Sequence, residues 1–340
     1  MTDDESVPDG GDEVVPDSGP ATDGGTEAAS GVDARLGREA DHADRLDRDA
    51  DHADRIGGEA VGETDAAAGV DLRGTAVGAA QVAVREYRLA VRRRWAVGVA
   101  VLFALFSASL VFLGGSGVGP ARVDAVLASF AQVGVYLVPL AALAVGYDAV
   151  VGADESGSLE LLAALPLSSA SVVVGKYLGR AAALGGGMLV GFAVGGALLV
   201  RYAGASALGA YAAVVLSAVA AALAFLAVSV LASTLAGEKT HALGAVLATW
   251  VWFVLVHDLA ALGLVATLDL PQWAVSAAVL LNPADLFRVL VLSGIPTTAG
   301  GIAGVLETAS LEPTALAAAL AAWTAVPLAA AVAAFRRRSL

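Results

Sequence analysis

Six long apolar runs, separated by short polar stretches, make up most of the sequence after residue 94. Each run is close to or longer than the roughly 20 residues that an α-helix needs to cross a bilayer. The pattern predicts an all-α integral membrane protein with six transmembrane helices. We place these helices at residues 95–113, 126–150, 178–200, 207–234, 241–267 and 314–335.

The stretch between the fifth and sixth runs, from Leu270 to Gly294, has a different pattern. Its two apolar halves hold about ten residues each, too few to cross a bilayer. They are interrupted at Asn282, Pro283 and Asp285. We expect an outer re-entrant helical hairpin whose second half is capped by Asn282 or Asp285; the alternative is a helix on the outer surface.

Arg288 lies three residues after Asp285 in the second half of this hairpin. An arginine at this depth could contact an anionic headgroup or substrate. It could also pair with Asp285 on the neighbouring helical turn. The sequence leaves both roles open.

A short leucine-rich segment lies between the second and third apolar runs, at residues 153–176. Leu159, Leu162 and Leu165 recur on one helical face, and Pro166 ends the helix. Ser156 or Ser158 can cap this helix, and Ser168 or Ser169 can cap the next one. At about 1.5 Å per residue the helix spans about 12 Å, so it should lie beside the membrane rather than across it.

The basic residues are distributed unevenly about the predicted helices, which sets the expected orientation. If the first helix begins on the cytoplasmic side, eleven basic residues lie on the cytoplasmic side and three on the outer side. Because basic residues are in excess on the cytoplasmic side of membrane proteins, this count predicts that both termini and the leucine-rich segment are cytoplasmic. The cytoplasmic set is Arg85, Arg88, Arg92, Arg93, Arg94, Lys176, Arg180, Lys239, Arg336, Arg337 and Arg338; the outer set is Arg122, Arg201 and Arg288.

Composition separates an N-terminal tail from the membrane domain. The chain is 57% hydrophobic yet carries a net charge of −13. Residues 1–80 contain 21 acidic and 6 basic side chains, so the negative charge belongs to the tail. Because such a segment buries too little apolar surface to offset its ordering entropy, we expect residues 1–75 to form a disordered acidic cytoplasmic tail. Residues 76–340 would form the membrane domain.

Residues 81–94 lead from the acidic tail to the first apolar run and have an amphipathic pattern. Val84, Tyr87 and Val91 share one helical stripe, while the arginines between them can reach phosphate headgroups. We expect an interfacial helix lying on the cytoplasmic leaflet, although arginines that merely flank a membrane span would also fit.

Two features inside the apolar runs have alternative readings. His257 and Asp258 form an adjacent ionisable pair in the fifth run, where such residues are costly and often functional; they suggest a proton relay or an interfacial or bundle-facing polar pair. Gly187, Gly191 and Gly195 recur every four residues in the third run, which favours close helix packing, within the chain or between subunits, over the alternative of a substrate path.

Two segments carry a family resemblance. Gly157–Ser168, reading GSLELLAALPLS, resembles the coupling-helix signature of ABC-2 type transporter permeases, although Ser169 and Ala170 stand where basic residues usually follow. Asn282–Arg288, reading NPADLFR, resembles an element of the same family, particularly of the subgroup that includes the permease for nitrous oxide reductase maturation. Residues 81–94 resemble the elbow helix of such permeases.

The resemblance implies a permease subunit in the plasma membrane, working as an exporter. A separate cytosolic ATPase subunit would dock on residues 154–170 and would bind the ATP and Mg²⁺, while this chain binds no cofactor. Six spans are half the number usual for a complete transporter of this family, so the resemblance implies a homodimer or a pair with a sister permease. The residues implied in ATPase coupling are Glu155, Ser158, Leu159, Glu160, Leu161, Leu162, Leu165 and Pro166.

The sequence does not contain a catalytic motif of its own. No GxxxxGK[ST] phosphate loop occurs, so we expect a transport subunit that does not hydrolyse ATP and is not an enzyme. The chain has no cysteine for a thiolate metal site, and we expect no metal site and no nucleic-acid partner. The alternative function is an ion-coupled secondary carrier that uses His257 and Asp258 and needs no ATPase. A third possibility is a membrane anchor that presents the acidic tail.

Overall fold

The computed structural model describes residues 74–113, 120–159, 167–268, 271–293 and 311–337. The chain divides into two units, Met1–Ala67 and Ala68–Leu340, and every described residue belongs to the second unit. The described residues form helices and turns, without a strand among them. The expected acidic tail lies almost wholly outside the described residues.

Six helices of the described chain are long and apolar enough to cross a membrane, which confirms the all-α class and the number of spans. A turn over residues 147–150 leads from the second of them into a short helix, α4, Val151–Glu155. The spans are α2 (Trp95–Leu113), α3 (Pro120–Gly146), α6 (Ser169–Ala203), α7 (Leu208–Leu235), α8 (Lys239–Val251) continued by α9 (His257–Thr267), and α13 (Pro313–Arg336).

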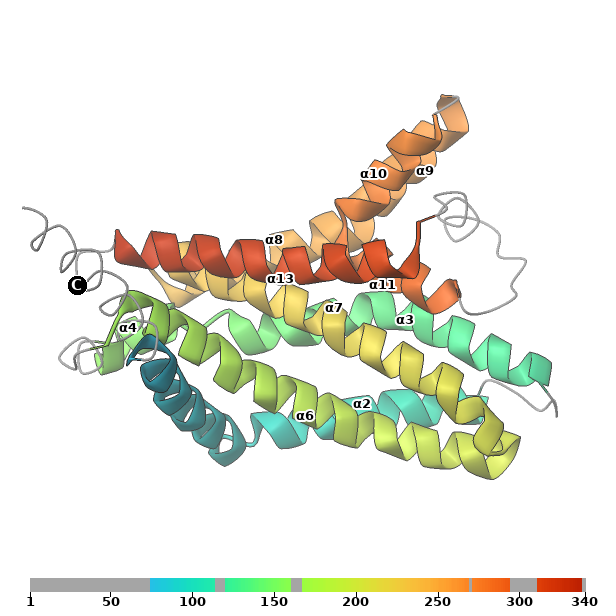
Figure 1. Cartoon of the computed structure of the whole chain (residues 1–340), viewed down its shortest axis with the longest axis horizontal. Helices are drawn as coiled ribbons and strands as arrows, with labels where there is room; N and C mark the ends of the chain where they lie inside the picture. The colour runs from blue at the N-terminus through green and yellow to red at the C-terminus, as the bar shows by residue number, and fades with distance from the viewer. Residues whose placement is uncertain (1–73, 114–119, 160–166, 269–270, 294–310, 338–340) are drawn as a thin grey trace, which may run out of the picture. The chain divides into compact units, whose positions relative to one another are not determined.

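Helices α3, α6 and α7 form the centre of the bundle, where more than half of their most apolar residues are buried. Helix α2 packs along α6, and α13 packs along α7 (Figure 1). Aromatic rings from four helices meet between α2, α3, α6 and α7, including Phe103, Phe130, Phe192 and Tyr211. Only a minor part of α2, α8 and α13 is buried, as expected for helices whose surfaces face lipid or another subunit.

The glycine stripe of α6 lies against α2 of the same chain, which decides between the two packing readings. A Cβ atom added at Gly191 would lie 2.6 Å from the Ala100 carbonyl oxygen, and one at Gly187 would lie 2.8 Å from the Ala96 oxygen. The missing side chains therefore let two helix backbones approach closely. This stripe serves packing within the chain.

We expect Gly191→Val to destabilise the bundle by about 2 kcal/mol, because the new methyl groups would force α2 and α6 apart. The matched control is Gly186→Val on the same helix, where an added Cβ meets nothing within 4 Å. The measurement is the unfolding midpoint of both variants in detergent. Equal midpoints would show that the close approach of these helices contributes little to stability.

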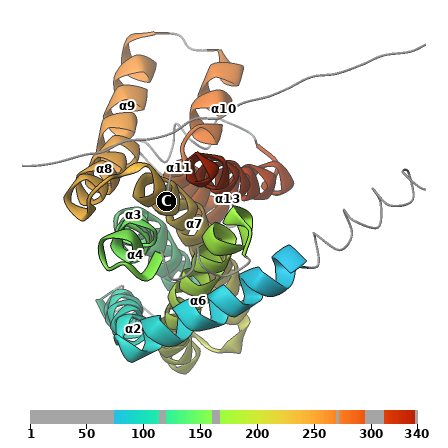
Figure 2. The ribbon, with the colours of Figure 1, turned by 90° about the vertical axis from the view of Figure 1, so that its left-hand side faces the viewer.

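The amphipathic segment before α2 forms a helix over residues 74–92. It lies across α6 (Figure 2), and a Cβ atom at Gly179 would lie 2.6 Å from the Ala83 carbonyl oxygen. The predicted stripe of Val84, Tyr87 and Val91 points away from the bundle, since each of these side chains is at least 40% exposed. One face of this N-terminal helix thus binds protein while another stays free and apolar.

Between α9 and α13, the described residues 271–293 form two short helices, α10 (Gln272–Leu280) and α11 (Pro283–Leu292), bent by 110° at the break. Asn282 caps α11 by accepting a hydrogen bond from the Ala284 amide. Of the two predicted capping residues, Asn282 and Asp285, it is therefore Asn282 that caps this helix. Helix α11 is buried against α3, α7 and α13. A π-helical turn at Trp252–Val256 separates α8 from α9.

Candidate functional site

The break between α3 and α4 is held by two serines of α7. The backbone amides of Val150 and Val151 both donate to Ser233 Oγ, at 3.0 and 3.2 Å. One turn earlier on α7, Ser229 Oγ donates to the Leu143 carbonyl oxygen at 2.8 Å. Because these bonds satisfy buried backbone groups left by the turn, the start of the leucine-rich segment is fixed to the bundle centre.

Glu155, at the end of α4, bridges to the first residue of α8. Its carboxylate accepts a hydrogen bond from the Lys239 backbone amide at 2.7 Å, and its second oxygen lies 3.3 Å from Lys239 Nζ. A carboxylate at this position also interacts favourably with the positive end of the helix dipole. Glu155 thus joins the end of α4 to the start of the fifth span.

The chain reverses after α4 at Gly157, whose φ of +67° suits a residue without a side chain. Ser156 and Ser158 donate their hydroxyl hydrogens to the Ala153 carbonyl oxygen. Ser158 and Leu159 are helical and Leu159 is buried, while residues 160–166 lie outside the described residues.

The structure thus places three of the eight residues expected to contact an ATPase. Glu155, Ser158 and Leu159 lie together at the end of the bundle that also holds the C-terminal end of α13 (Figure 1). Beyond the gap, Ser168 caps α6 by accepting from the Ser171 amide, as expected of one of two serines. Glu160, Leu161, Leu162, Leu165 and Pro166 lie outside the described residues.

A buried ion cluster lies beside this segment, between the N-terminal helix, α3 and α6. Lys176 is 1% exposed, and its Nζ atom donates to Glu86 Oε1 at 2.9 Å. Arg180 Nε lies 3.9 Å from the other Glu86 oxygen, and its Nη1 atom donates to Asp148 at 2.5 Å and to the Val145 carbonyl oxygen. One glutamate therefore holds the N-terminal helix to two cations of α6.

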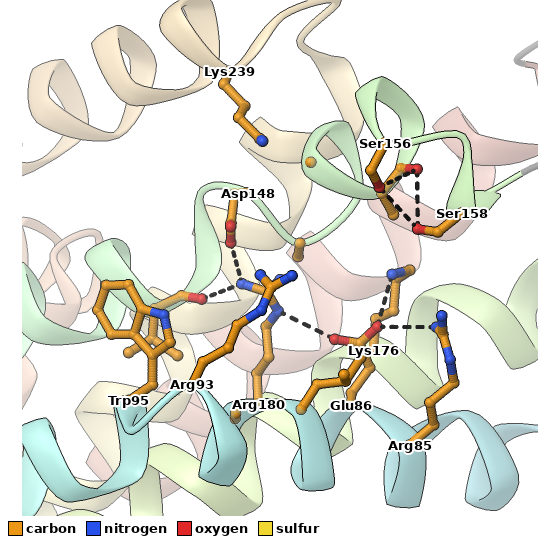
Figure 3. Close-up of a pocket in the computed structure, with 16 residues that line it drawn as sticks. Arg85, Glu86, Arg93, Trp95, Asp148, Ser156, Ser158, Lys176, Arg180 and Lys239 are labelled. Atoms are coloured by element: carbon orange, nitrogen blue, oxygen red, sulfur yellow. Dashed lines mark hydrogen bonds and ion pairs between the residues drawn. The ribbon is translucent and has the colours of Figure 1, made fainter.

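The cluster lines a cavity of about 320 Å³ that also reaches α4 and α8. Figure 3 shows Arg85 and Glu86 on the N-terminal helix facing Lys176 and Arg180, with Asp148 and Lys239 across the cavity. The cavity therefore adjoins α4 and Lys239, the residue of α8 that binds the end of α4. Both lysines of the chain, Lys176 and Lys239, lie on its wall.

A second polar site, which we name the hairpin cluster, comprises His257, Asp258, Asn282, Asp285 and Arg288. Arg288 is 2% exposed and donates to Asp285 at 3.0 Å and to Asp258 at 2.8 Å. His257 Nδ1 lies 3.1 Å from Asp285, and Asn282 Nδ2 donates to Asp285 at 3.0 Å. The two ionisable features that the sequence presents separately are one network here.

The hairpin cluster also ties α11 to the break in the fifth span. Asn282 Nδ2 donates to the Phe253 carbonyl oxygen at 2.9 Å, within the π-helical turn that precedes His257. The ligand atoms of His257, Asp258 and Asp285 lie within 4.8 Å of one another, a spacing that could suit a metal ion. In the structure, however, the Arg288 guanidinium binds both carboxylates that a cation would need.

Comparison with known proteins identifies the family. Residues 80–340 match the ABC-2 family transporter protein family. The chain belongs to this family. The permease is 36% identical over 272 residues to a protein of Pseudomonas aeruginosa named "Probable ABC transporter permease protein NosY", which covers 76% of this chain and 98% of that protein. It is 33% identical over 273 residues to the protein of the same name from Stutzerimonas stutzeri, and the alignment covers 76% of this chain and 97% of that protein.

Membership establishes the general role that the sequence resemblance implied. This ABC-2 permease is a multi-pass membrane protein and a permease subunit of an ABC transporter, a class that works with an ATPase subunit. The expected leucine-rich and hairpin segments belong to the matched region, residues 80–340.

Glu86 is the main site residue of the permease that the sequence analysis did not single out. It is the one acidic residue within the otherwise basic stretch of residues 81–94, and this isolation was the available signal. It faces α6, where Gly175 and Gly179 leave room for the N-terminal helix. Its two partners, Lys176 and Arg180, had been counted only as cytoplasmic charges.

Proposed function

We propose that this permease couples ATP hydrolysis by a separate cytosolic ATPase subunit to export of a substrate across the plasma membrane. The observation that carries the proposal is the anchoring of the segment before Glu160. Ser233 binds the start of α4, and Lys239 binds its end. A force applied to this segment would therefore reach α7 and α8 as well as α3.

In this mechanism the ATPase docks on residues 154–170. Glu160 would make a polar contact, and Leu161, Leu162 and Leu165 would fill a groove on the ATPase. Pro166 would end the docking helix, and Ser168 begins α6 directly afterwards. Nucleotide-driven closure of paired ATPases would push the segment and tilt α3 and α6, which shifts the bundle between its inward and outward states. ATP and Mg²⁺ would stay on the partner, and this chain would bind no cofactor.

The orientation follows from charge. The end of the bundle with α4 carries the arginines of the N-terminal helix together with Lys176, Arg180 and Lys239. An excess of basic residues marks the cytoplasmic side of a membrane protein. Both termini would then be cytoplasmic, and α10 and α11 would enter the outer leaflet as a re-entrant hairpin, because neither is long enough to span it.

We also propose that two permease chains assemble, either as a homodimer or with a sister permease. One chain supplies six spans, and α8 with α9 has the smallest buried fraction of them, at 11%. Small and apolar residues exposed on such helices are suited to pack against a second subunit.

The test is to purify the tagged full-length chain in mild detergent at high salt and to identify the proteins that co-purify. We expect a stoichiometric ATPase with the wild type, and at least tenfold less with Glu160→Arg, equivalent to about 1.4 kcal/mol of binding free energy. Reversing this charge should leave membrane insertion intact, since residues 154–170 lie outside the predicted spans.

The matched control is Glu312→Arg, a charge reversal at an exposed residue just before α13. It should retain the ATPase. Equal retention by both variants would contradict the docking site. A wild-type preparation free of any ATPase would instead favour the ion-coupled carrier that uses His257 and Asp258.

A further inference from the structure

We propose that the cavity beneath α4 binds the phosphate group of an anionic lipid. The proposal concerns a site separate from the ATPase contact and holds whether or not an ATPase docks. Its ligand class follows from the charge of the cavity wall, from a buried donor left without an acceptor, and from the position of the cavity beside an interfacial helix.

The charge of the wall favours an anion. Five basic side chains line the cavity, against two acidic ones, Glu86 and Asp148. Arg85, Lys176 and Arg180 all share the Glu86 carboxylate. Around the rest of the wall, Lys239 pairs with Glu155, and the Arg93 side chain has no ion pair with any described residue. A phosphate would compensate this excess positive charge.

Arg180 supplies the second observation. Its Nε atom is buried and has no hydrogen-bond acceptor among the described residues, although the Glu86 carboxylate lies within ion-pair distance. Buried donors are almost always satisfied by protein, water or a bound ion. Arginine also has the donor geometry that suits phosphate oxygens. A phosphate in the cavity would provide the missing acceptor.

The surroundings favour a lipid as the source of the phosphate. Trp95, which lines the cavity, begins the first membrane span, and tryptophan is enriched at membrane interfaces. Val84, Tyr87 and Val91 are exposed on the N-terminal helix that also carries Arg85 of the cavity wall, and Arg93 follows directly after this helix. This helix is therefore suited to lie on the headgroup layer, where basic pockets take anionic headgroups. The volume of about 320 Å³ is within the range of small-ligand pockets.

The first experiment counts lipids bound to the detergent-solubilised full-length chain by native mass spectrometry. Phosphatidylglycerol and phosphatidylcholine with the same acyl chains are titrated separately, and inorganic phosphate is then added as a competitor. We expect one phosphatidylglycerol to bind at least tenfold more tightly than phosphatidylcholine. Binding should persist in about 1 M salt, where exposed charges are screened beyond about 3 Å. Complete displacement by millimolar phosphate would assign the cavity to a free anion and overturn the lipid source.

Rim variants test the location. Arg85→Gln with Arg93→Gln should weaken phosphatidylglycerol binding about tenfold, because both arginines line the cavity. The matched control is Arg88→Gln with Arg92→Gln, which removes the same charge from exposed positions of the same helix that do not line it. The control should stay within about twofold of the wild type. Equal losses in the two double variants would show only general surface attraction and would overturn the site.

A third experiment uses the wild-type protein, so that its result does not depend on whether the variants fold. Phosphatidylglycerol, but not phosphatidylcholine, should slow acetylation of Lys239 relative to the N-terminal amine, since Lys239 is the partly exposed lysine of the wall. Unchanged acetylation would contradict the proposal. Carbodiimide coupling tests whether the acidic tail occupies the cavity instead of a lipid. A crosslink from a carboxylate of residues 1–67 to Lys239 would show that the tail fills the cavity and would overturn the lipid proposal.

Discussion

Arg288→Met should lower the free energy of unfolding of the permease by about 3 kcal/mol, because it leaves Asp258 and Asp285 close together without their cation. Arg288 donates to both carboxylates and is 2% exposed, and no other described lysine or arginine lies within ion-pair distance of them; His257, at 3.1 Å, contacts Asp285 only. The measurement is the unfolding midpoint in detergent, with Arg201→Met as the control because Arg201 is an exposed arginine on α6.

Neutralising the partners provides the decisive comparison. When Arg288→Met is combined with Asp258→Asn and Asp285→Asn, no uncompensated charge remains, and most of the lost stability should return. If the triple variant is as unstable as the single one, the cost comes from the shape of arginine rather than from its charge. An unfolding midpoint unchanged in the single variant would show that the hairpin cluster is not needed to hold α11 in place.

Hydropathy was sufficient to predict the fold class and the six spans, because the length and composition of each run alone decide whether it can cross a bilayer. The ends of the helices were less predictable. Helix α6 begins at Ser169, earlier than the predicted span at residue 178. Lys176 interrupts the apolar pattern there, yet its pairing with Glu86 lets this part of the helix be buried.

Helix α3 differs from its predicted span for a related reason. It ends at Gly146, before residue 150, and gives way to a turn. The turn is stable because Ser233, far away in the sequence, accepts hydrogen bonds from Val150 and Val151. A local pattern contains no information about such a partner.

The candidate sites were predicted residue by residue but not as assemblies. Asn282, Asp285 and Arg288 were recognisable from the interruption of the hairpin, and His257 with Asp258 from their cost in a membrane span. These five residues come together because of the 110° bend between α10 and α11 and the π-helical turn in the fifth span. Neither feature produces a regular spacing of apolar residues from which it could be predicted. Glu86 was missed because its partners lie ninety residues away.

The fifth span connects the two sites. Its first residue, Lys239, binds Glu155 at the end of α4, and after the π-helical turn His257 and Asp258 belong to the hairpin cluster. π-Helical turns often occur at functional positions and offer a natural place for a helix to change its direction. In the proposed transport cycle, α8 and α9 therefore link the docking segment to the hairpin cluster, because this one span has ion pairs with both.

Glu86→Gln should be the second strongly destabilising change, at about 3 kcal/mol, because Lys176 and Arg180 would lose the carboxylate that they share. Adding Lys176→Met should restore most of this loss by removing the buried charge. Glu238→Gln, at an exposed glutamate, is the control for loss of a carboxylate. The measurement is again the unfolding midpoint in detergent.

The same variant separates a purely structural role of the cavity from the proposed binding site. Glu86→Gln increases the excess positive charge of the wall, so phosphatidylglycerol should bind it more tightly than the wild type and recover part of the lost stability, since a ligand specific for the folded state stabilises that state. Phosphatidylcholine should have no such effect. If both lipids raise the unfolding midpoint equally, the ion cluster serves only to hold the N-terminal helix against α6.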